Sequence, residues 1–280
     1  MKPLTFLLAG LLAGASLCPW ASAQRATLVL REGDVVPGVG VLTDITGVAG
    51  VDQEGRWLAW IDTDNADNAQ DGVLVSGSGL ELREGSSLPQ PAGATLDAID
   101  GWSLTGTGGY FTTVSMDGTA GSAADEALMR DGTLLLREGD PVGAAGFSSG
   151  TNWRQLFEVW SVNSSAALLA GNVDDPNLPT TTDRALVLLD LDSAGQILSS
   201  TVVGAEGSLL GTGLPALADV GVSPQSAALN AAGSVLFQGR FDGAPAPTDV
   251  GLFLDGQLLA REGSPSPIGA RSWEILSDRP

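Results

Sequence analysis

The chain has no histidine and only one cysteine and one lysine in 280 residues. The lysine is Lys2 and the cysteine is Cys18, so the chain after residue 23 contains no Lys, Cys or His. These absences exclude a cysteine or lysine nucleophile, a Ser–His pair, an imidazole base and a Cys/His zinc site from that part of the chain. An enzyme built on it would have to use carboxylate chemistry.

Positive charge is also scarce, with 13 Lys+Arg against 33 Asp+Glu and a formal net charge of −20. Phosphate backbones and anionic lipid surfaces repel a chain of this charge. We therefore expect no nucleic-acid partner, and the partner classes that remain are proteins and glycans.

The N-terminus carries the one long apolar run of the sequence. Lys2 precedes a stretch rich in Leu, Ala and Gly, Leu4–Leu17, and Ala21-Ser22-Ala23 is a small-x-small cleavage site. The run is shorter than the roughly 20 apolar residues that a membrane-spanning helix needs. Lipidation at Cys18 is the alternative, but Leu17 is large where a small residue is required. The sequence predicts a signal peptide over residues 1–23, a single domain over 24–280 with no transmembrane segment, and export to the periplasm or the cell exterior.

An internal repeat is the strongest signal in the sequence. A short motif, Arg-Glu-Gly, returns with steps of 52, 54, 68 and 56 residues between successive glutamates. One copy has lost its arginine. The copies are Arg31-Glu32-Gly33, Arg83-Glu84-Gly85, Arg137-Glu138-Gly139, Ala205-Glu206-Gly207 and Arg261-Glu262-Gly263.

Each repeat contains four short segments with strand character, separated by Gly, Asp and Ser turns. A two-residue hairpin signal, Asp131-Gly132, joins the third and fourth segments of the second repeat, and Asp255-Gly256 does so in the last. In the second repeat we predict strands over Thr95–Leu104, Gly109–Met116, Glu126–Arg130 and Thr133–Arg137.

Second segments such as Trp57–Ile61, Ala166–Ala170 and Val235–Phe237 are almost continuously apolar, as expected of strands covered on both faces. Four-stranded units of this length that cover one another are typical of β-propellers. We predict an all-β, β-propeller-like array of four complete units plus a partial fifth, to which Ala26–Arg31 and Ser272–Leu276 contribute. An open β-repeat array or a sandwich is the alternative.

The turn before one second strand carries a family resemblance. Asn230-Ala231-Ala232-Gly233-Ser234-Val235-Leu236-Phe237 resembles the tandem Asn-x-x-Gly-x-x-Ala-Phe repeat of secreted bacterial proteins, and Asp52-Gln53-Glu54-Gly55 is a looser copy. The resemblance implies a propeller-like fold and no assigned activity. Asn230 and Gly233 would close a tight turn and Phe237 would be core. The C-terminal apolar anchor common in such proteins does not occur in this sequence.

The Arg-Glu-Gly copies have two interpretations. In the structural one, Arg and Glu alternate faces at the end of a fourth strand, Gly starts the turn to the next unit, and Arg pairs with an acid of an adjacent unit. In the functional one, a ring of arginines binds an anionic ligand.

Acids also recur at both ends of the loops between second and third strands. Such residues accept backbone N–H groups in turns, and the alternative is a Ca²⁺ site, because hard cations prefer clustered oxygen ligands. The densest loop supplies Asp62, Asp64, Asn65, Asp67 and Asp71 as candidate ligands, although it does not fit an EF-hand. The loop-end pairs are Asp62 and Asp71, Asp117 and Asp125, Asp174 and Asp183, and Asp242 and Asp249.

Three tryptophans, Trp102, Trp153 and Trp273, sit near the start of first strands, where they would either pack between units or stack on sugar rings. Glycoside hydrolysis needs only a pair of carboxyl groups. Sequence neighbours that could form one are Asp97 with Asp100 and Asp125 with Glu126.

Export, repeats and the poor catalytic inventory favour a secreted, non-catalytic binding or interaction module with a protein or glycan ligand. The alternatives are a carbohydrate-active enzyme that uses an Asp/Glu pair and a structural surface-array protein.

Overall fold

The computed structural model describes residues 28–52, 54–106, 109–119, 124–154, 158–177, 184–221, 226–267 and 271–273. The chain divides into two compact units, Met1–Arg31 and Glu32–Pro280, and the second contains every strand. The predicted signal peptide lies outside the described residues. Within the described ranges, no helix has the length and apolar character needed to cross a membrane.

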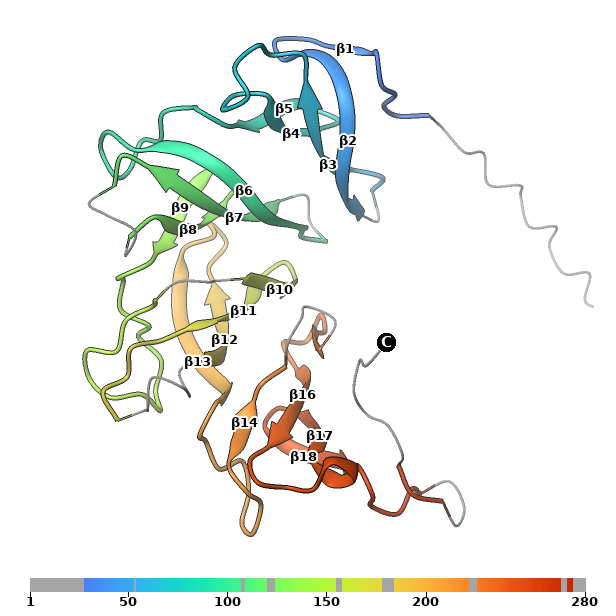
Figure 1. Cartoon of the computed structure of the whole chain (residues 1–280), viewed down its shortest axis with the longest axis vertical. Coiled ribbons are helices and arrows are strands. Elements are labelled where there is room, and N and C mark those ends of the chain that lie inside the picture. The colour runs from blue at the N-terminus through green and yellow to red at the C-terminus, as the bar shows by residue number, and fades with distance from the viewer. Residues whose placement is uncertain are drawn as a thin grey trace, which may run out of the picture. The chain divides into compact units, whose positions relative to one another are not determined.

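The described chain is all-β, and its strands form four antiparallel sheets in chain order (Figure 1). A 3₁₀ turn, η2 (Ala246–Thr248), precedes β17. Sheet 1 contains β1 (Val35–Val36), β2 (Gly40–Val51), β3 (Trp57–Thr63), β4 (Gly72–Ser76) and β5 (Gly79–Arg83); sheet 2 contains β6 (Thr95–Leu104), β7 (Tyr110–Asp117), β8 (Glu126–Arg130) and β9 (Thr133–Arg137); sheet 3 contains β10 (Glu158–Val162), β11 (Ala166–Asn172), β12 (Arg184–Leu191) and β13 (Ile197–Ala205); sheet 4 contains β14 (Leu217–Asp219), β15 (Ala227–Leu229), β16 (Val235–Phe241), β17 (Val250–Leu254) and β18 (Gln257–Arg261).

The predicted strands of the second repeat are confirmed to within one residue at each end, as β6 to β9. Each sheet follows the same meander, in which every strand pairs with the next along the chain. Sheet 4 departs from it because its first strand is split: β14 and β15 both pair with β16.

The two predicted Asp-Gly hairpins are confirmed, and their sequence explains their geometry. Both residues of each turn have positive φ, 49° and 73° for Asp131 and Gly132, as a type I′ turn requires. The aspartate also accepts a hydrogen bond from the first N–H of the second strand, because Asp131 Oδ1 lies 2.8 Å from the Tyr110 nitrogen. Asp255 makes the equivalent bond to Val235 at 2.7 Å.

The repeat motif joins each unit to the next by a closed pair of backbone hydrogen bonds. The motif glycine donates to a residue near the start of the following unit, and that residue donates back to the residue after the glycine, with all ten distances between 2.7 and 3.0 Å. The five links are Gly33–Leu42, Gly85–Leu96, Gly139–Trp153, Gly207–Leu217 and Gly263–Trp273.

The fifth link puts Trp273 where earlier units begin their first strand, as a partial fifth unit requires. Most of the strand predicted over Ser272–Leu276 lies outside the described residues. The strand predicted over Ala26–Arg31 is not formed in its described part, because Leu28–Arg31 belong to no strand.

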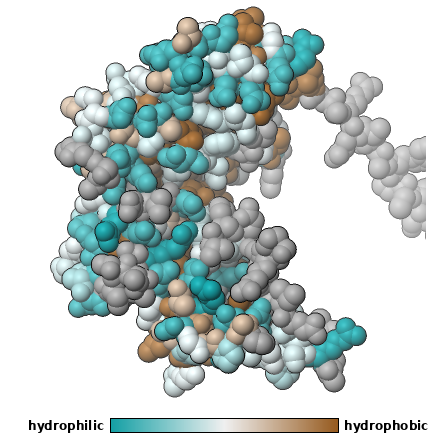
Figure 2. Space-filling view, in the orientation of Figure 1, coloured by the Kyte–Doolittle hydropathy of each residue, from teal (hydrophilic) through white to brown (hydrophobic). Residues whose placement is uncertain are grey.

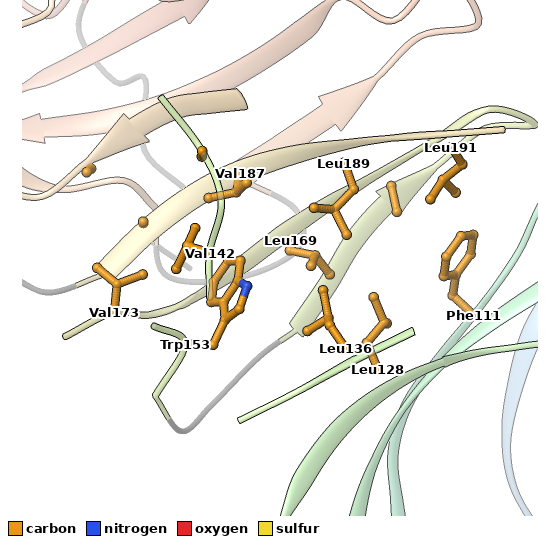
Figure 3. Close-up of a cluster of buried hydrophobic side chains, with 14 residues drawn as sticks. Phe111, Leu128, Leu136, Val142, Trp153, Leu169, Val173, Val187, Leu189 and Leu191 are labelled. Carbon is orange, nitrogen blue, oxygen red and sulfur yellow. The ribbon is translucent and has the colours of Figure 1, made fainter. Parts of the chain in front are cut away.

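The hydrophobic cores lie between consecutive sheets. One core joins sheets 1 and 2, a second joins sheets 2 and 3, and a third joins sheets 3 and 4. In the second, Phe111, Leu128 and Leu136 of sheet 2 face Leu169 and Val187 of sheet 3 (Figure 3). Sheets 2 and 3 are thus buried on both faces, which makes the fold a β-propeller-like array of four-stranded units.

The surface is mixed in polarity. On the face shown in Figure 2, hydrophilic residues are interspersed with hydrophobic ones.

Candidate functional site

A cleft of about 500 Å³, lined by both polar and apolar residues, opens between sheets 2 and 3. Beyond it, the two sheets meet through the apolar residues of their shared core. The cleft walls come from the first three strands of sheet 2 and the first strand of sheet 3. The lining segments are Asp100–Ser103 of β6, Thr113–Ser115 of β7, Glu126–Ala127 of β8 and Glu158–Trp160 of β10.

A β-bulge positions Asp100. The pairing of β6 with β7 steps from Ile99–Val114 to Gly101–Thr113, so Asp100 is an extra residue without its own partner on β7. Bulges redirect side chains and occur often beside binding sites. Burial and the neighbouring charge of Asp97 raise the pKa of Asp100. Asp100 is solvent-exposed, yet its raised pKa makes it a better proton donor near neutral pH than an aspartate with the ordinary pKa.

Glu126 begins β8 on the same side of sheet 2 as Leu128, two residues further along. A second acid, Glu138, lies behind it and is only 5% exposed. Burial, a side-chain hydrogen bond with Asp125 and the charge of Glu126 raise the pKa of Glu138. Its Oε2 atom is buried and has no hydrogen-bond partner among the described residues. This end of the cleft therefore concentrates carboxyl groups within a partly desolvated region.

Glu158 closes the opposite wall and is held by two neighbours. The indole N–H of Trp160 donates to Glu158 Oε2 over 2.8 Å, and Arg184 Nη2 lies 3.6 Å from the same oxygen. The Arg184 guanidinium also sits 5.5 Å from the centre of the Trp160 ring. Trp160 is 6% exposed and belongs to the core between sheets 3 and 4. It orients Glu158 from behind and leaves little ring surface for a ligand.

The residues that line the cleft combine carboxylates with hydroxyls and include no Arg or Lys. Ser103, Thr113 and Ser115 supply the hydroxyls. Carboxylates accept hydrogen bonds, and hydroxyls both donate and accept them. The cleft is therefore suited to a ligand rich in hydrogen-bond donors, which polyols and ammonium groups both are.

The structure separates the carboxylate pairs that sequence adjacency suggested. Asp100 and Glu126, one from each predicted pair, line the same cleft, whereas Asp97 does not line it and Asp125 contacts Glu138. Sequence reasoning missed Glu158. Its position on a first strand, two residues before Trp160, is the feature by which it could have been found.

Two of the three predicted tryptophans pack within the protein, and one of them, Trp102, also lines the cleft. Trp153 is 2% exposed in the core between sheets 2 and 3. Trp102 packs against Trp60, with ring centres 6.1 Å apart, and over Gly47, where a Cβ would lie 2.5 Å from the indole. Trp273 is partly exposed and takes part in the fifth link between units.

The Arg-Glu-Gly motif has a structural use in each described copy. In the four copies after the first, the glutamate donates its backbone N–H to the first carbonyl of the third strand, and the Glu84 side chain accepts a hydrogen bond from the Gly72 nitrogen over 3.2 Å. Arg83 donates to the carbonyl of Val39 over 2.8 Å. Arg261 donates to the carbonyl of Thr248 over 2.8 Å and lies 4.6 Å from the Phe241 ring centre. Donation to backbone carbonyls was in neither interpretation of the motif.

The Asn-x-x-Gly turn forms as its chemistry predicts. Asn230 Oδ1 accepts the backbone N–H groups of Ala232 and Ser234, both at 2.9 Å, and Gly233 has a φ of 87°. Phe237 is fully buried and stacks on Phe253 with ring centres 5.1 Å apart. Asp52 makes the same turn, accepting from Glu54 and Arg56.

The predicted calcium ligands are not gathered around one point. Asp64 Oδ1 accepts from the Val41 nitrogen over 2.8 Å, and Asn65 and Asp67 accept N–H groups within their own loop. Burial and the charges of Asp71 and Asp44 raise the pKa of Asp62. Within the described ranges, no group of three or more Asp, Glu, Cys or His residues is arranged to hold a metal ion.

Comparison with protein-family models, with curated proteins and with solved structures found no match for this chain.

Proposed function

We propose that the protein is a secreted, non-catalytic binding module that takes a glycan into the cleft between sheets 2 and 3. The observation that carries this proposal is the convergence of Asp100, Glu126 and Glu158 with three hydroxyl side chains on one cleft. Its volume of about 500 Å³ is in the range of small-ligand sites. Sugar hydroxyls donate hydrogen bonds to carboxylates, and a neutral sugar does not meet the repulsion that an anion would.

Export and the family resemblance support the same proposal from the sequence. The apolar N-terminal run followed by Ala21-Ser22-Ala23 is typical of a signal peptide, which would deliver the domain to the periplasm or the cell exterior. The Asn230–Phe237 segment resembles repeats of secreted bacterial proteins without an assigned activity.

The test is a screen of neutral oligosaccharides on a glycan array, followed by calorimetric titration of any that bind. Glu126→Gln should weaken binding at least about tenfold, since hydrogen bonds to charged groups contribute roughly 1.5–3 kcal/mol. Asp117→Asn, on an exposed residue of the same sheet outside the cleft, is the matched control. Equal binding by both variants would contradict the assignment of the cleft.

A carbohydrate-active enzyme is the second candidate, and one observation favours it. Asp100 and Glu126 line the same cleft, and the raised pKa of Asp100 suits a general acid. Release of reducing ends from a bound oligosaccharide would identify an enzyme. Binding of the oligosaccharide without release of reducing ends would support the non-catalytic binding module instead. The array alternative requires contacts between copies of the chain.

A further inference from the structure

The lining of the cleft between sheets 2 and 3 is negatively charged. It includes Asp100, Glu126 and Glu158 and no Arg or Lys. Glu158 has a cationic neighbour behind the cleft wall, because Arg184 Nη2 lies 3.6 Å from its Oε2 atom. The charge that acts on Asp100 is that of another acid, Asp97. A ligand in this cleft therefore meets carboxylates and no lining cation.

The β-bulge that presents Asp100 does not require an acid. Thr46 is the extra residue of the corresponding bulge of β2, and it follows the link residue Leu42 by four positions, as Asp100 follows Leu96. Its hydroxyl donates a hydrogen bond to a backbone carbonyl of β3 over 3.1 Å. The same backbone irregularity thus forms around a neutral side chain in sheet 1.

The repeat does not require an acid at Glu126 either. The motif glutamate of each sheet donates its backbone N–H to the carbonyl of one third-strand residue, which is Glu126 in sheet 2. The equivalent residues of the other sheets are Gly72, Arg184 and Val250. A position that holds glycine, arginine and valine in other sheets places no demand on its side chain. The carboxylate of Glu126 therefore has no part in the framework of the repeat.

Carboxyl groups at this end of the cleft repel one another. Glu138, behind Glu126, is 5% exposed, and its Oε2 atom has no hydrogen-bond partner in the part of the chain that the structure describes. Burial and the charges of Asp125 and Glu126 raise the pKa of Glu138. Like charges in a desolvated region disfavour one another's ionised form. A positively charged ligand would offset this repulsion, and a neutral ligand would not.

A single metal ion does not fit the arrangement. Among the residues that the structure describes, no three acids converge on a point where one ion could bind. The lining carboxylates instead come from three strands, β6, β8 and β10. Positive charges spaced along a chain suit such a distributed set. A cleft lined by charge of one sign also raises the local concentration of a ligand of the opposite sign.

The hydroxyl groups of the cleft favour an amino glycan over a basic peptide. Ser103, Thr113 and Ser115 line the same cleft as the carboxylates. Hydroxyls both donate and accept hydrogen bonds, and sugar hydroxyls do the same, whereas a lysine ammonium group only donates. A glycan with free amino groups can therefore match both kinds of side chain in the lining.

We propose that the cleft binds glycans with free amino groups, such as oligomers of glucosamine, more tightly than their N-acetylated counterparts. This inference rests on the proposed glycan-binding function and adds to it a preference for positive charge. Asp100 and Glu126 carry the preference, because neither carboxylate is required by the fold.

Calorimetric titration with two oligosaccharides of equal length tests the preference. One is an oligomer of glucosamine and the other an oligomer of N-acetylglucosamine, both in mildly acidic buffer, where the free amino groups are protonated. At low ionic strength the glucosamine oligomer should bind at least about tenfold more tightly. The preference should shrink at about 1 M salt, where the Debye length is about 3 Å.

Two variants assign the preference to the cleft. Asp100→Asn removes one charge at an exposed position and keeps a hydrogen-bond acceptor, so it should reduce the preference about two- to fivefold. Asp117→Asn removes the same charge from an exposed residue of sheet 2 outside the cleft and should leave the preference unchanged. Circular dichroism spectra check that both variants are folded.

The possible failures are distinguishable. Equal binding of the two oligomers by the unmodified chain would overturn the charge preference and leave the glycan-binding function standing, while binding of neither would overturn both. An equal loss of preference in both variants would show that the net charge of the protein, and not the cleft, is responsible. Tighter binding of an oligolysine than of the glucosamine oligomer would assign the cleft to basic peptides and overturn the choice of a glycan.

Discussion

Leu168 and Leu236 occupy the same repeat position in sheets 3 and 4, yet Leu168 is fully buried and Leu236 is 36% exposed. Truncation of each to alanine therefore measures how much a following sheet contributes at this position. Leu168→Ala removes the same atoms as Leu236→Ala, from strands with the same pairing pattern. The pair isolates burial from strand propensity.

The magnitudes follow from the two environments. Leu168→Ala leaves a cavity in the core between sheets 3 and 4 and should cost roughly 3–5 kcal/mol. Leu236→Ala leaves no closed cavity, and it loses only the transfer free energy of the buried part of the side chain, about 1–1.5 kcal/mol. The expected difference in the free energy of unfolding is about 2–3 kcal/mol.

Urea denaturation, followed by tryptophan fluorescence at low protein concentration, gives both values. Equal costs for the two substitutions would refute the reasoning. They would mean that Leu236 is covered within the folded chain.

Three further outcomes follow from single sites. Gly85 has a φ of +72°, and a Cβ there would lie 2.5 Å from a side-chain carbon, whereas Gly33 has a φ of +85° and no described atom within 4 Å of such a Cβ. Gly85→Ala should therefore destabilise the fold by roughly 1–3 kcal/mol more than Gly33→Ala. Equal shifts of the melting temperature for the two variants would contradict this. Asp131→Ala puts alanine at positive φ and removes the acceptor of the Tyr110 N–H, so we expect a loss of about 2 kcal/mol in urea titrations, and an unchanged midpoint would show that the hairpin does not depend on this side chain. The pKa of Glu138 is raised in the folded state, so its contribution to stability increases as the pH falls toward the ordinary value of 4.5 and is lost as the pH rises through the folded pKa. Glu138→Gln should abolish that part of the pH dependence of stability. An unchanged pH–stability curve would show that the Glu138 carboxyl does not cause it.

Much of the fold could be predicted because its determinants are local. The hairpin at Asp131-Gly132 needs positive φ at two residues, and the turn at Asn230 needs a side-chain acceptor and a glycine. Such preferences act over a few residues and do not depend on the rest of the chain. The recurrence of Arg-Glu-Gly also predicted where one unit joins the next, which the five backbone links confirm.

The candidate site could be predicted only in part. Asp100 and Glu126 were among the candidate carboxylates, but each was paired with its sequence neighbour. A bulge in β6 and the packing of sheet 2 on sheet 3 bring them to one cleft with Glu158. Bulges have no reliable sequence signal, and residues 26 and 32 positions apart along the chain become neighbours only through sheet packing.

The sequence alone determined the all-β repeat, its turns and its charge, because backbone propensity, turn chemistry and apolar alternation are properties of short segments. The tertiary structure decided which carboxylates share a cleft, which tryptophans are core and which leucines are open to solvent. Those outcomes depend on which face of each sheet meets a neighbour, as the leucines Leu168, fully buried, and Leu236, 36% exposed, show.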